Sequence, residues 1–109
     1  MTEALLQFQR DQNGAAETLY VSGELDIATA STLERTVAGT LDGQGGEFRL
    51  DVSAMTFMDS TGAQALLHVH NRVESLGRRL VIVSPTRPVR RVLEIMGLDR
   101  VVNVQGCAR

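Results

Sequence analysis

Residues 48–73 have the sequence FRLDVSAMTFMDSTGAQALLHVHNRV, which changes from a strand pattern to a helix pattern within a few positions. Apolar and polar residues alternate over 48–52, which is typical of a strand with one buried face. From Ala63 onward, apolar residues recur three and four positions apart, which predicts a helix with one buried side. The segment between them, Asp59-Ser60-Thr61-Gly62, is therefore expected to be the turn in which a strand leads into a helix N-terminus.

The same two patterns recur on both sides of this segment. The predicted elements are strands at 4–9, 18–25, 48–52, 80–83 and 101–104, and helices at 30–41, 63–76 and 88–96. Turn-forming residues at 11–14 separate the first two strands, which favours an antiparallel hairpin. Thr29 and Ser31 are candidate N-caps of the first helix, and Ser31 with Glu34 fits a capping box.

The order of these elements predicts an α/β fold. After the hairpin, strands and helices alternate, and such alternation implies parallel strands joined by helical crossovers. We therefore expect a mixed, mostly parallel β-sheet with an N-terminal antiparallel hairpin and with helices packed on it. The 109 residues fit a single domain spanning 1–109, long enough to bury a core of its own.

Composition excludes several classes of function. The chain has 13 acidic residues and 11 basic ones, all arginine, for a net charge of -2. The absence of lysine excludes Schiff-base chemistry and a Walker-type phosphate loop, and the near-neutral charge argues against binding to nucleic acid. No apolar run approaches the roughly 20 residues that span a bilayer, and Cys107 has no partner for an internal disulfide. A cytoplasmic domain is expected.

Ser60 is the residue in the expected turn with the most interesting chemistry. The first N–H groups of a helix lack partners, so Ser, Thr and Asp side chains at this position most often serve as caps. A hydroxyl at a helix N-terminus is also a favourable place for a phosphate, because the helix dipole and the free N–H groups stabilise negative charge. Both interpretations, capping and modification, remain open from the residues alone.

The residues around Ser60 favour binding over catalysis. Asp26 follows a predicted strand and would lie near Ser60 if both turns share one edge of the sheet. The only candidate bases for a hydrolytic serine, His68 and His70, lie about 12 and 15 Å along the helix from Ser60. We expect His68 to be solvated and His70 to be a hydrogen-bonded core histidine. Neither a metal site nor a cofactor is expected.

Three stretches together resemble a STAS domain of the bacterial anti-sigma factor antagonist type. They are Val21-Ser22-Gly23-Glu24-Leu25-Asp26, Phe57-Met58-Asp59-Ser60-Thr61-Gly62, and Val89-Arg90-Arg91-Val92-Leu93-Glu94-Ile95-Met96-Gly97-Leu98. The second is similar to the family's phosphorylation signature, Asp-Ser-Ser/Thr-Gly. The likeness covers essentially the whole chain. This chain has Ala63-Gln64 where the family often has Leu-Gly, a departure that bears on partner choice.

The resemblance implies partner switching. An unmodified antagonist of this family binds an anti-sigma factor with a GHKL-type serine kinase domain and releases a sigma factor. Phosphorylation of the antagonist ends this binding, and a PP2C-type phosphatase restores it. The alternative is a STAS adaptor or structural subunit of a transporter or stress-sensing complex, without a phospho-switch.

Carried over by position, the resemblance makes Ser60 the phosphate acceptor. Asp26, Asp59, Thr61 and Gly62 are then the residues that support phosphorylation, and Thr61 is a possible second acceptor. The residues that we expect to contact the partner are Met58, Gln64, Ala65 and His68. We expect no enzymatic activity, and we expect the chain to bind neither nucleic acid nor a membrane.

Overall fold

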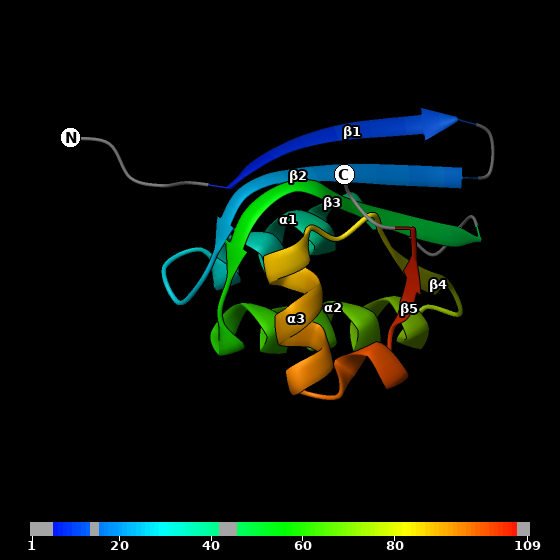
Figure 1. Cartoon of the computed structure of the whole chain (residues 1–109). Helices are drawn as coiled ribbons and strands as arrows, with labels where there is room; N and C mark the ends of the chain where they lie inside the picture. The colour runs from blue at the N-terminus through cyan, green and yellow to red at the C-terminus, as the bar shows by residue number, and fades with distance from the viewer. Residues whose placement is uncertain (1–5, 14–15, 42–45, 107–109) are drawn as a thin grey trace.

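The computed structural model describes residues 6–13, 16–41 and 46–106. These residues form a five-stranded sheet with three α-helices on one of its faces (Figure 1). The strands are β1 (Gln7–Asn13), β2 (Ala16–Leu25), β3 (Glu47–Met58), β4 (Arg79–Val83) and β5 (Asn103–Gln105). The helices are α1 (Ala30–Thr40), α2 (Ser60–Ser75) and α3 (Arg87–Ile95), and a short 3-10 helix follows at Leu98–Arg100.

The sheet confirms the predicted topology. Its strand order is β1-β2-β3-β4-β5; β1 pairs antiparallel with β2, and every later neighbour is parallel. The antiparallel hairpin is longer than expected, because β1 continues to Asn13 through three of the four residues assigned to the turn. Gly14 lies outside the described residues. The parallel strands bring the turns after β2 and β3 to one edge of the sheet, as the order of elements implied.

β3 is also longer than its pattern predicted. The sequence indicated a strand that ends at Val52, whereas the structure continues it to Met58. The pairing of β2 with β3 is irregular beyond Tyr20, with register shifts that insert extra residues into β3. These bulges interrupt the alternation of buried and exposed positions, so the sequence loses its strand pattern while the strand itself continues. Gly23 lies at this irregularity with a φ of 110°, in the left-handed region that glycine tolerates.

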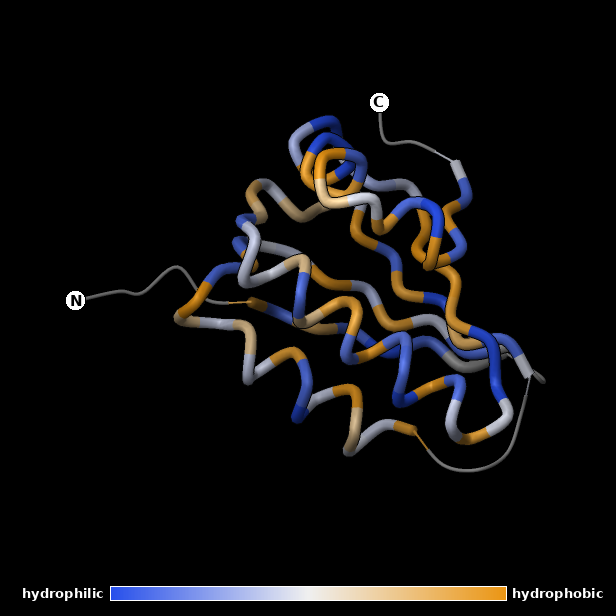
Figure 2. The backbone as a smooth tube through the Cα atoms, turned by 90° about the horizontal axis from the view of Figure 1, so that it is seen from below, coloured by the Kyte–Doolittle hydropathy of each residue, from blue (hydrophilic) through white to orange (hydrophobic). Residues whose placement is uncertain are grey.

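The core lies between the sheet and the three helices. Its fully buried side chains come from the strands and from all three helices: Leu19, Leu25, Leu33, Phe48, Leu50, Leu66, Leu80 and Leu93. Figure 2, seen from the helix side, shows apolar and polar residues alternating in short groups along the helices, as expected where one side of each helix is buried. Among the described residues, no helix combines the length and apolarity needed to cross a membrane.

The start of α1 differs from the prediction. Ser31 lies inside the helix, so the expected capping box of Ser31 and Glu34 is wrong. Thr29 occupies the N-cap position, but its side chain makes no capping hydrogen bond to the helix. The helix start is instead held by the backbone of the preceding turn, where Ala30 N donates to Asp26 O at 2.8 Å. The predicted first-turn position of Pro88 in α3 is confirmed.

Candidate functional site

The ends of β2 and β3 bring two acidic turns side by side. Leu25 and Met58 are register partners at the ends of these strands, so Asp26 and Asp59 leave the sheet next to each other. The backbone N–H of Asp59 donates to the carbonyl oxygen of Leu25 at 3.2 Å, which ties the two turns together. The expectation that Asp26 lies near the Ser60 turn therefore agrees with the backbone geometry.

Asp59 caps α2 and leaves the hydroxyl of Ser60 available. The Oδ1 atom of Asp59 accepts a hydrogen bond from Gly62 N at 2.9 Å, and its carbonyl oxygen accepts one from Ala63 N at 2.9 Å. Ser60 is the first residue of the helix and is exposed. Its hydroxyl forms no hydrogen bond with any residue that the structure describes. Because Asp59 performs the capping, Ser60 presents a free hydroxyl to solvent at the positive end of the helix dipole.

Gly62 allows α2 to approach the end of β2. A Cβ atom at this position would lie 2.4 Å from the backbone oxygen of Leu25, 2.8 Å from Leu25 Cγ and 2.9 Å from Met58 Cγ. Carbon and oxygen atoms cannot approach so closely, so any other residue would push the helix start away from the strand. Gly62 thus fixes the spacing between the Ser60 turn and the Asp26 turn.

Asp26 is held by its own turn through one carboxylate oxygen. Oδ1 accepts a hydrogen bond from Ala28 N at 2.9 Å and lies 3.3 Å from the hydroxyl of Thr29. Neither Asp26 nor Asp59 forms an ion pair with a described residue. Two carboxylates without cations therefore flank the exposed Ser60, and this edge carries a local negative charge.

Two of the four expected partner contacts are wrong. Met58 and Ala65 are 2% and 1% exposed and belong to the hydrophobic core, so they do not present a surface to a partner. Met58 ends β3 opposite the buried Leu25, and Ala65 lies on the side of α2 that packs on the core. Gln64 and His68 are exposed, as their place on the helix predicted.

The structure adds two exposed apolar residues that the sequence did not indicate. Ile27, directly after Asp26, is 79% exposed, and Phe57, three residues before Ser60, is 45% exposed. Large apolar side chains in such positions are candidates for contact with another protein. The only sequence signal for Ile27 is a large apolar residue directly after Asp26, between a predicted strand and a predicted helix. Phe57 gives none, because the irregular pairing of β3 hides which face of the strand it occupies.

The two histidines occupy other parts of α2. His68 Nδ1 lies 3.2 Å from Glu34 Oε2 on α1, so His68 contacts the neighbouring helix in addition to being exposed. The prediction for His70 is wrong, because its buried Nδ1 atom has no hydrogen-bond partner among the described residues. Among the residues that the structure describes, no group of three or more His, Cys, Asp or Glu side chains could hold a metal ion.

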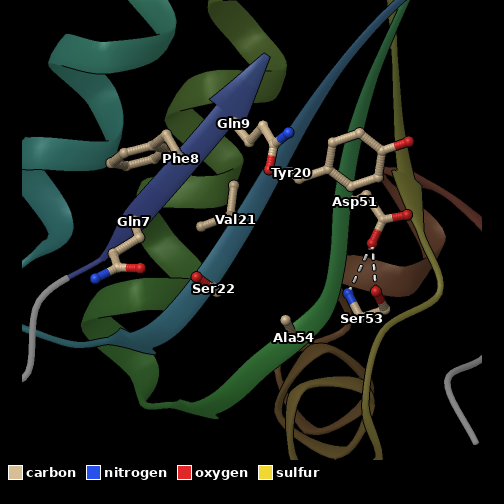
Figure 3. Close-up of a pocket in the computed structure, with 9 residues that line it drawn as sticks. All are labelled: Gln7, Phe8, Gln9, Tyr20, Val21, Ser22, Asp51, Ser53 and Ala54. Atoms are coloured by element: carbon tan, nitrogen blue, oxygen red, sulfur yellow. Dashed lines mark hydrogen bonds between the residues drawn. The ribbon is translucent and has the colours of Figure 1, made fainter. Parts of the chain in front are cut away.

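Two hollows lie away from Ser60. One, of about 270 Å³, is on the sheet and is lined by residues of β1, β2 and β3 (Figure 3). There Asp51 Oδ1 accepts hydrogen bonds from the N–H and the hydroxyl of Ser53, at 2.9 and 2.7 Å. The other, of about 360 Å³, is a groove between α1 and α2 beside the pair of His68 and Glu34. Neither includes a residue of the two acidic turns, nor does a third hollow, of about 590 Å³, beside Arg87, Arg90 and Arg91 of α3.

Comparison with known proteins identifies relatives along most of the chain. The family model described as "Mlab, STAS domain" matches residues 8–104. The chain is 29% identical over 90 residues to the anti-sigma-F factor antagonist RsfB of Mycobacterium tuberculosis, which covers 83% of this chain and 72% of the relative. It is 25% identical over 93 residues to the anti-sigma-B factor antagonist of Bacillus subtilis, covering 85% of this chain and 84% of the relative.

Solved structures share the fold. An anti-sigma factor antagonist from Mycobacterium paratuberculosis superposes with a TM-score of 0.76 at 24% identity, covering 92% of this chain and 85% of that one. The murine anion transporter Slc26a9 superposes with a TM-score of 0.78 at 19% identity, but only 17% of its chain is covered. The same fold thus occurs as a small separate protein and as a part of a much larger one.

Proposed function

This chain belongs to the STAS domain family, and from that premise we propose that it is an anti-sigma factor antagonist that works by partner switching in the cytoplasm. In this proposal the unmodified chain binds an anti-sigma factor with a GHKL-type serine kinase domain and thereby releases a sigma factor. The kinase phosphorylates Ser60 and ends the binding, and a PP2C-type phosphatase restores it. The chain acts as a regulatory binding protein and not as an enzyme.

The observation that carries this proposal is the exposed Ser60 hydroxyl at the start of α2. Asp59 supplies the cap of the helix through Gly62 N, so the hydroxyl of Ser60 is not needed to hold the fold. A serine that enters a kinase active site must give up the hydrogen bonds that its hydroxyl forms within its own chain. The hydroxyl of Ser60 has no such hydrogen bond with a described residue to lose. Thr61 is partly buried, which favours Ser60 as the acceptor.

The chemistry of the switch is a phosphoryl transfer. The Ser60 oxygen forms a bond to the γ-phosphorus of ATP, the bond between that phosphorus and the β,γ-bridging oxygen breaks, and ADP leaves. The serine proton passes to a base on the kinase. The product carries about -1.5 to -2 additional charge at a site already flanked by Asp26 and Asp59. Burying this charge against a partner costs several kcal/mol unless cations compensate it, which accounts for the loss of binding.

Exposed apolar side chains complete the docking surface that we propose. Ile27 and Phe57 flank the acidic turns and supply apolar area, while Ser60 and Gln64 supply the polar contacts. Binding energy at protein interfaces is concentrated in a few large side chains of this kind. Replacing Ile27 with Asp should therefore weaken binding to the anti-sigma factor by at least about tenfold, or about 1.4 kcal/mol. Because Ile27 is exposed, the fold should be unaffected.

Incubation with ATP and the cognate kinase, followed by intact mass measurement and peptide mapping, tests the proposal. We expect one phosphate, on Ser60, and none in Ser60→Ala. Thr61→Ala is the matched control and should still accept one phosphate. Ser60→Ala should bind the kinase and resist release, and Ser60→Asp should bind poorly. Phosphate on another residue, or none with a partner that binds, would contradict the assignment.

A second function is supported by one observation, the likeness of the chain to part of the murine anion transporter. In this alternative the domain would be an adaptor or structural subunit of a transporter or stress-sensing complex. The two functions differ in what happens on addition of ATP and kinase. A switch loses its partner when Ser60 is modified, whereas an adaptor keeps its partner under the same conditions.

A further inference from the structure

Thr29 lies beneath the Asp26 turn and is almost fully buried. It is 3% exposed, one of few buried polar residues among those that the structure describes. Its hydroxyl oxygen accepts a hydrogen bond from Asp26 N at 3.0 Å and donates to the carbonyl oxygen of Glu24 at 2.8 Å. One side chain thus connects Glu24, near the end of β2, to Asp26, which carries the carboxylate.

This arrangement is not that of an ordinary N-cap. A threonine at the N-cap position usually has extended backbone angles and accepts a hydrogen bond from an N–H two or three residues ahead. Thr29 has φ -116° and ψ -8° and makes no such bond. Its hydroxyl points back along the chain, to Glu24 and Asp26. The first turn of α1 therefore gains little from this hydroxyl, and the Asp26 turn gains two hydrogen bonds.

The Asp26 turn also contacts the Ser60 turn through its backbone. Leu25, between Glu24 and Asp26, accepts the backbone hydrogen bond of Asp59 at 3.2 Å. Gly62 also packs directly against the backbone of Leu25. A displacement of residues 24–26 would consequently move the carboxylate of Asp26 relative to the acceptor and disturb the start of α2.

We propose that Thr29 is a positioning residue that fixes the Asp26 carboxylate beside the acceptor turn and so sets the rate of Ser60 phosphorylation. The inference rests on the proposed function. Asp26 Oδ1 is engaged within the turn, while Oδ2 forms no hydrogen bond with a described residue and remains open to a group outside the chain. By binding the backbone N–H of Asp26, Thr29 fixes the residue that presents this oxygen to a group of the bound kinase. Misplacement of such a group by about 1 Å can cost up to about 100-fold in rate.

Replacement of Thr29 by valine removes the hydroxyl while keeping the shape of the side chain. We expect the kcat for phosphorylation by the cognate kinase to fall by about tenfold or more, with KM for the chain changed little. Thr29→Ser keeps the hydroxyl and should restore most of the rate. Thermal unfolding of both variants identifies any loss that comes from the fold alone.

A double-mutant cycle distinguishes positioning from general stabilisation. In the background of Asp26→Asn, Thr29→Val should lower the rate by no more than about twofold, because the group that it positions is already altered. Rate losses that multiply independently would overturn the proposal. An equal rate for Thr29→Val and the unaltered chain would overturn it as well.

Amide hydrogen exchange gives a second test that needs no kinase. The N–H of Ala28 donates to Asp26 Oδ1, so its protection reports whether the turn is held. We expect this protection to fall in Thr29→Val and to remain in Thr29→Ser. Unchanged protection in Thr29→Val would contradict the positioning role. Should the kinase leave Ser60 of the unaltered chain unmodified, the proposed function fails, and the exchange of Ala28 still decides whether Thr29 fixes Asp26.

Discussion

Charged side chains form ion pairs at the amino ends of the parallel strands, whereas the two acidic turns at the carboxyl ends form none with a described residue. At the amino ends, Glu17 and Arg78 form an ion pair of 3.3 Å with side chains only 4% and 2% exposed. Arg10 contacts the second oxygen of Glu17 at 2.9 Å, and Arg78 Nε donates to the carbonyl oxygen of Gly46 at 3.1 Å. At the carboxyl ends, by contrast, Asp26 and Asp59 form no ion pair with a described residue and flank an exposed hydroxyl.

This difference separates structure from function within one sheet. The buried pair at the amino ends joins the start of β2 to the residue before β4, and its charges are satisfied inside the molecule. The acidic turns at the carboxyl ends are held by backbone hydrogen bonds and by backbone N–H groups that donate to one oxygen of each carboxylate. No cation among the described residues pairs with either carboxylate, so their charges remain available to a partner. Carboxyl-terminal loops of parallel strands commonly carry the binding groups of α/β folds. Loss of a charge should therefore lower stability at the amino edge and partner binding at the carboxyl edge.

The largest expected effect on stability is at the amino edge. Glu17→Gln removes a carboxylate charge that pairs with the buried Arg78, and loss of one charge of a buried pair typically costs about 3–5 kcal/mol of unfolding free energy. Urea unfolding followed by circular dichroism measures this loss. Glu47→Gln is the matched control, because its pair with Arg49 is much more exposed and should contribute no more than about 1 kcal/mol. Similar losses for the two variants would remove the contrast between buried and exposed charge.

The next effect is steric and lies at the carboxyl edge. Gly62→Ala places a Cβ atom 2.4 Å from the backbone oxygen of Leu25, which cannot move without displacing β2. Overpacking of this kind costs about 1–3 kcal/mol, and we expect the upper end of that range. Gly39→Ala, in α1 with nothing within 4 Å of the new Cβ, should instead stabilise the protein by about 0.5–1 kcal/mol. The account of the close approach fails if both substitutions shift the urea midpoint in the same direction.

A smaller effect on stability distinguishes the capping hydrogen bond of Asp59 from its negative charge. Asp59→Ala removes the acceptor of Gly62 N and should cost about 1 kcal/mol of unfolding free energy. Asp59→Asn keeps an N-cap oxygen and should leave stability almost unchanged. Thermal or urea unfolding of the two variants checks this order. An equal loss in both would show that the carboxylate charge, and not the hydrogen bond, stabilises the start of α2.

Much of the fold was predictable because its signals are local. The change from alternation to helical spacing around Asp59 located the β3–α2 turn, and the order of elements gave the parallel sheet. The length of β3 was not predictable, since bulges against β2 broke the pattern on which the prediction depended. Thr29 likewise gave no local sign that its hydroxyl would turn back to Glu24 instead of capping α1.

The candidate site, like the fold, was predictable only in part. Ser60 and Asp59 followed from the position of the turn, and Asp26 followed from the shared edge of parallel strands. Which side chains reach the surface depends on packing between elements, and here the sequence failed for Met58 and Ala65. Hydrogen bonds around Asp26 determine the path of the turn that exposes Ile27. A periodic sequence pattern does not predict such a path.

Titration of the cognate anti-sigma factor with unmodified and with Ser60-phosphorylated protein, followed by isothermal calorimetry, tests the central claim most directly. The account predicts that the phosphate weakens binding by at least about 100-fold, equivalent to about 2.7 kcal/mol. Glu17→Gln, where it remains folded, should bind with the affinity of the unaltered chain, because its charge lies at the opposite edge of the sheet. Equal affinities for the phosphorylated and unmodified proteins would contradict the claim that the carboxyl edge is a phosphate-controlled binding surface.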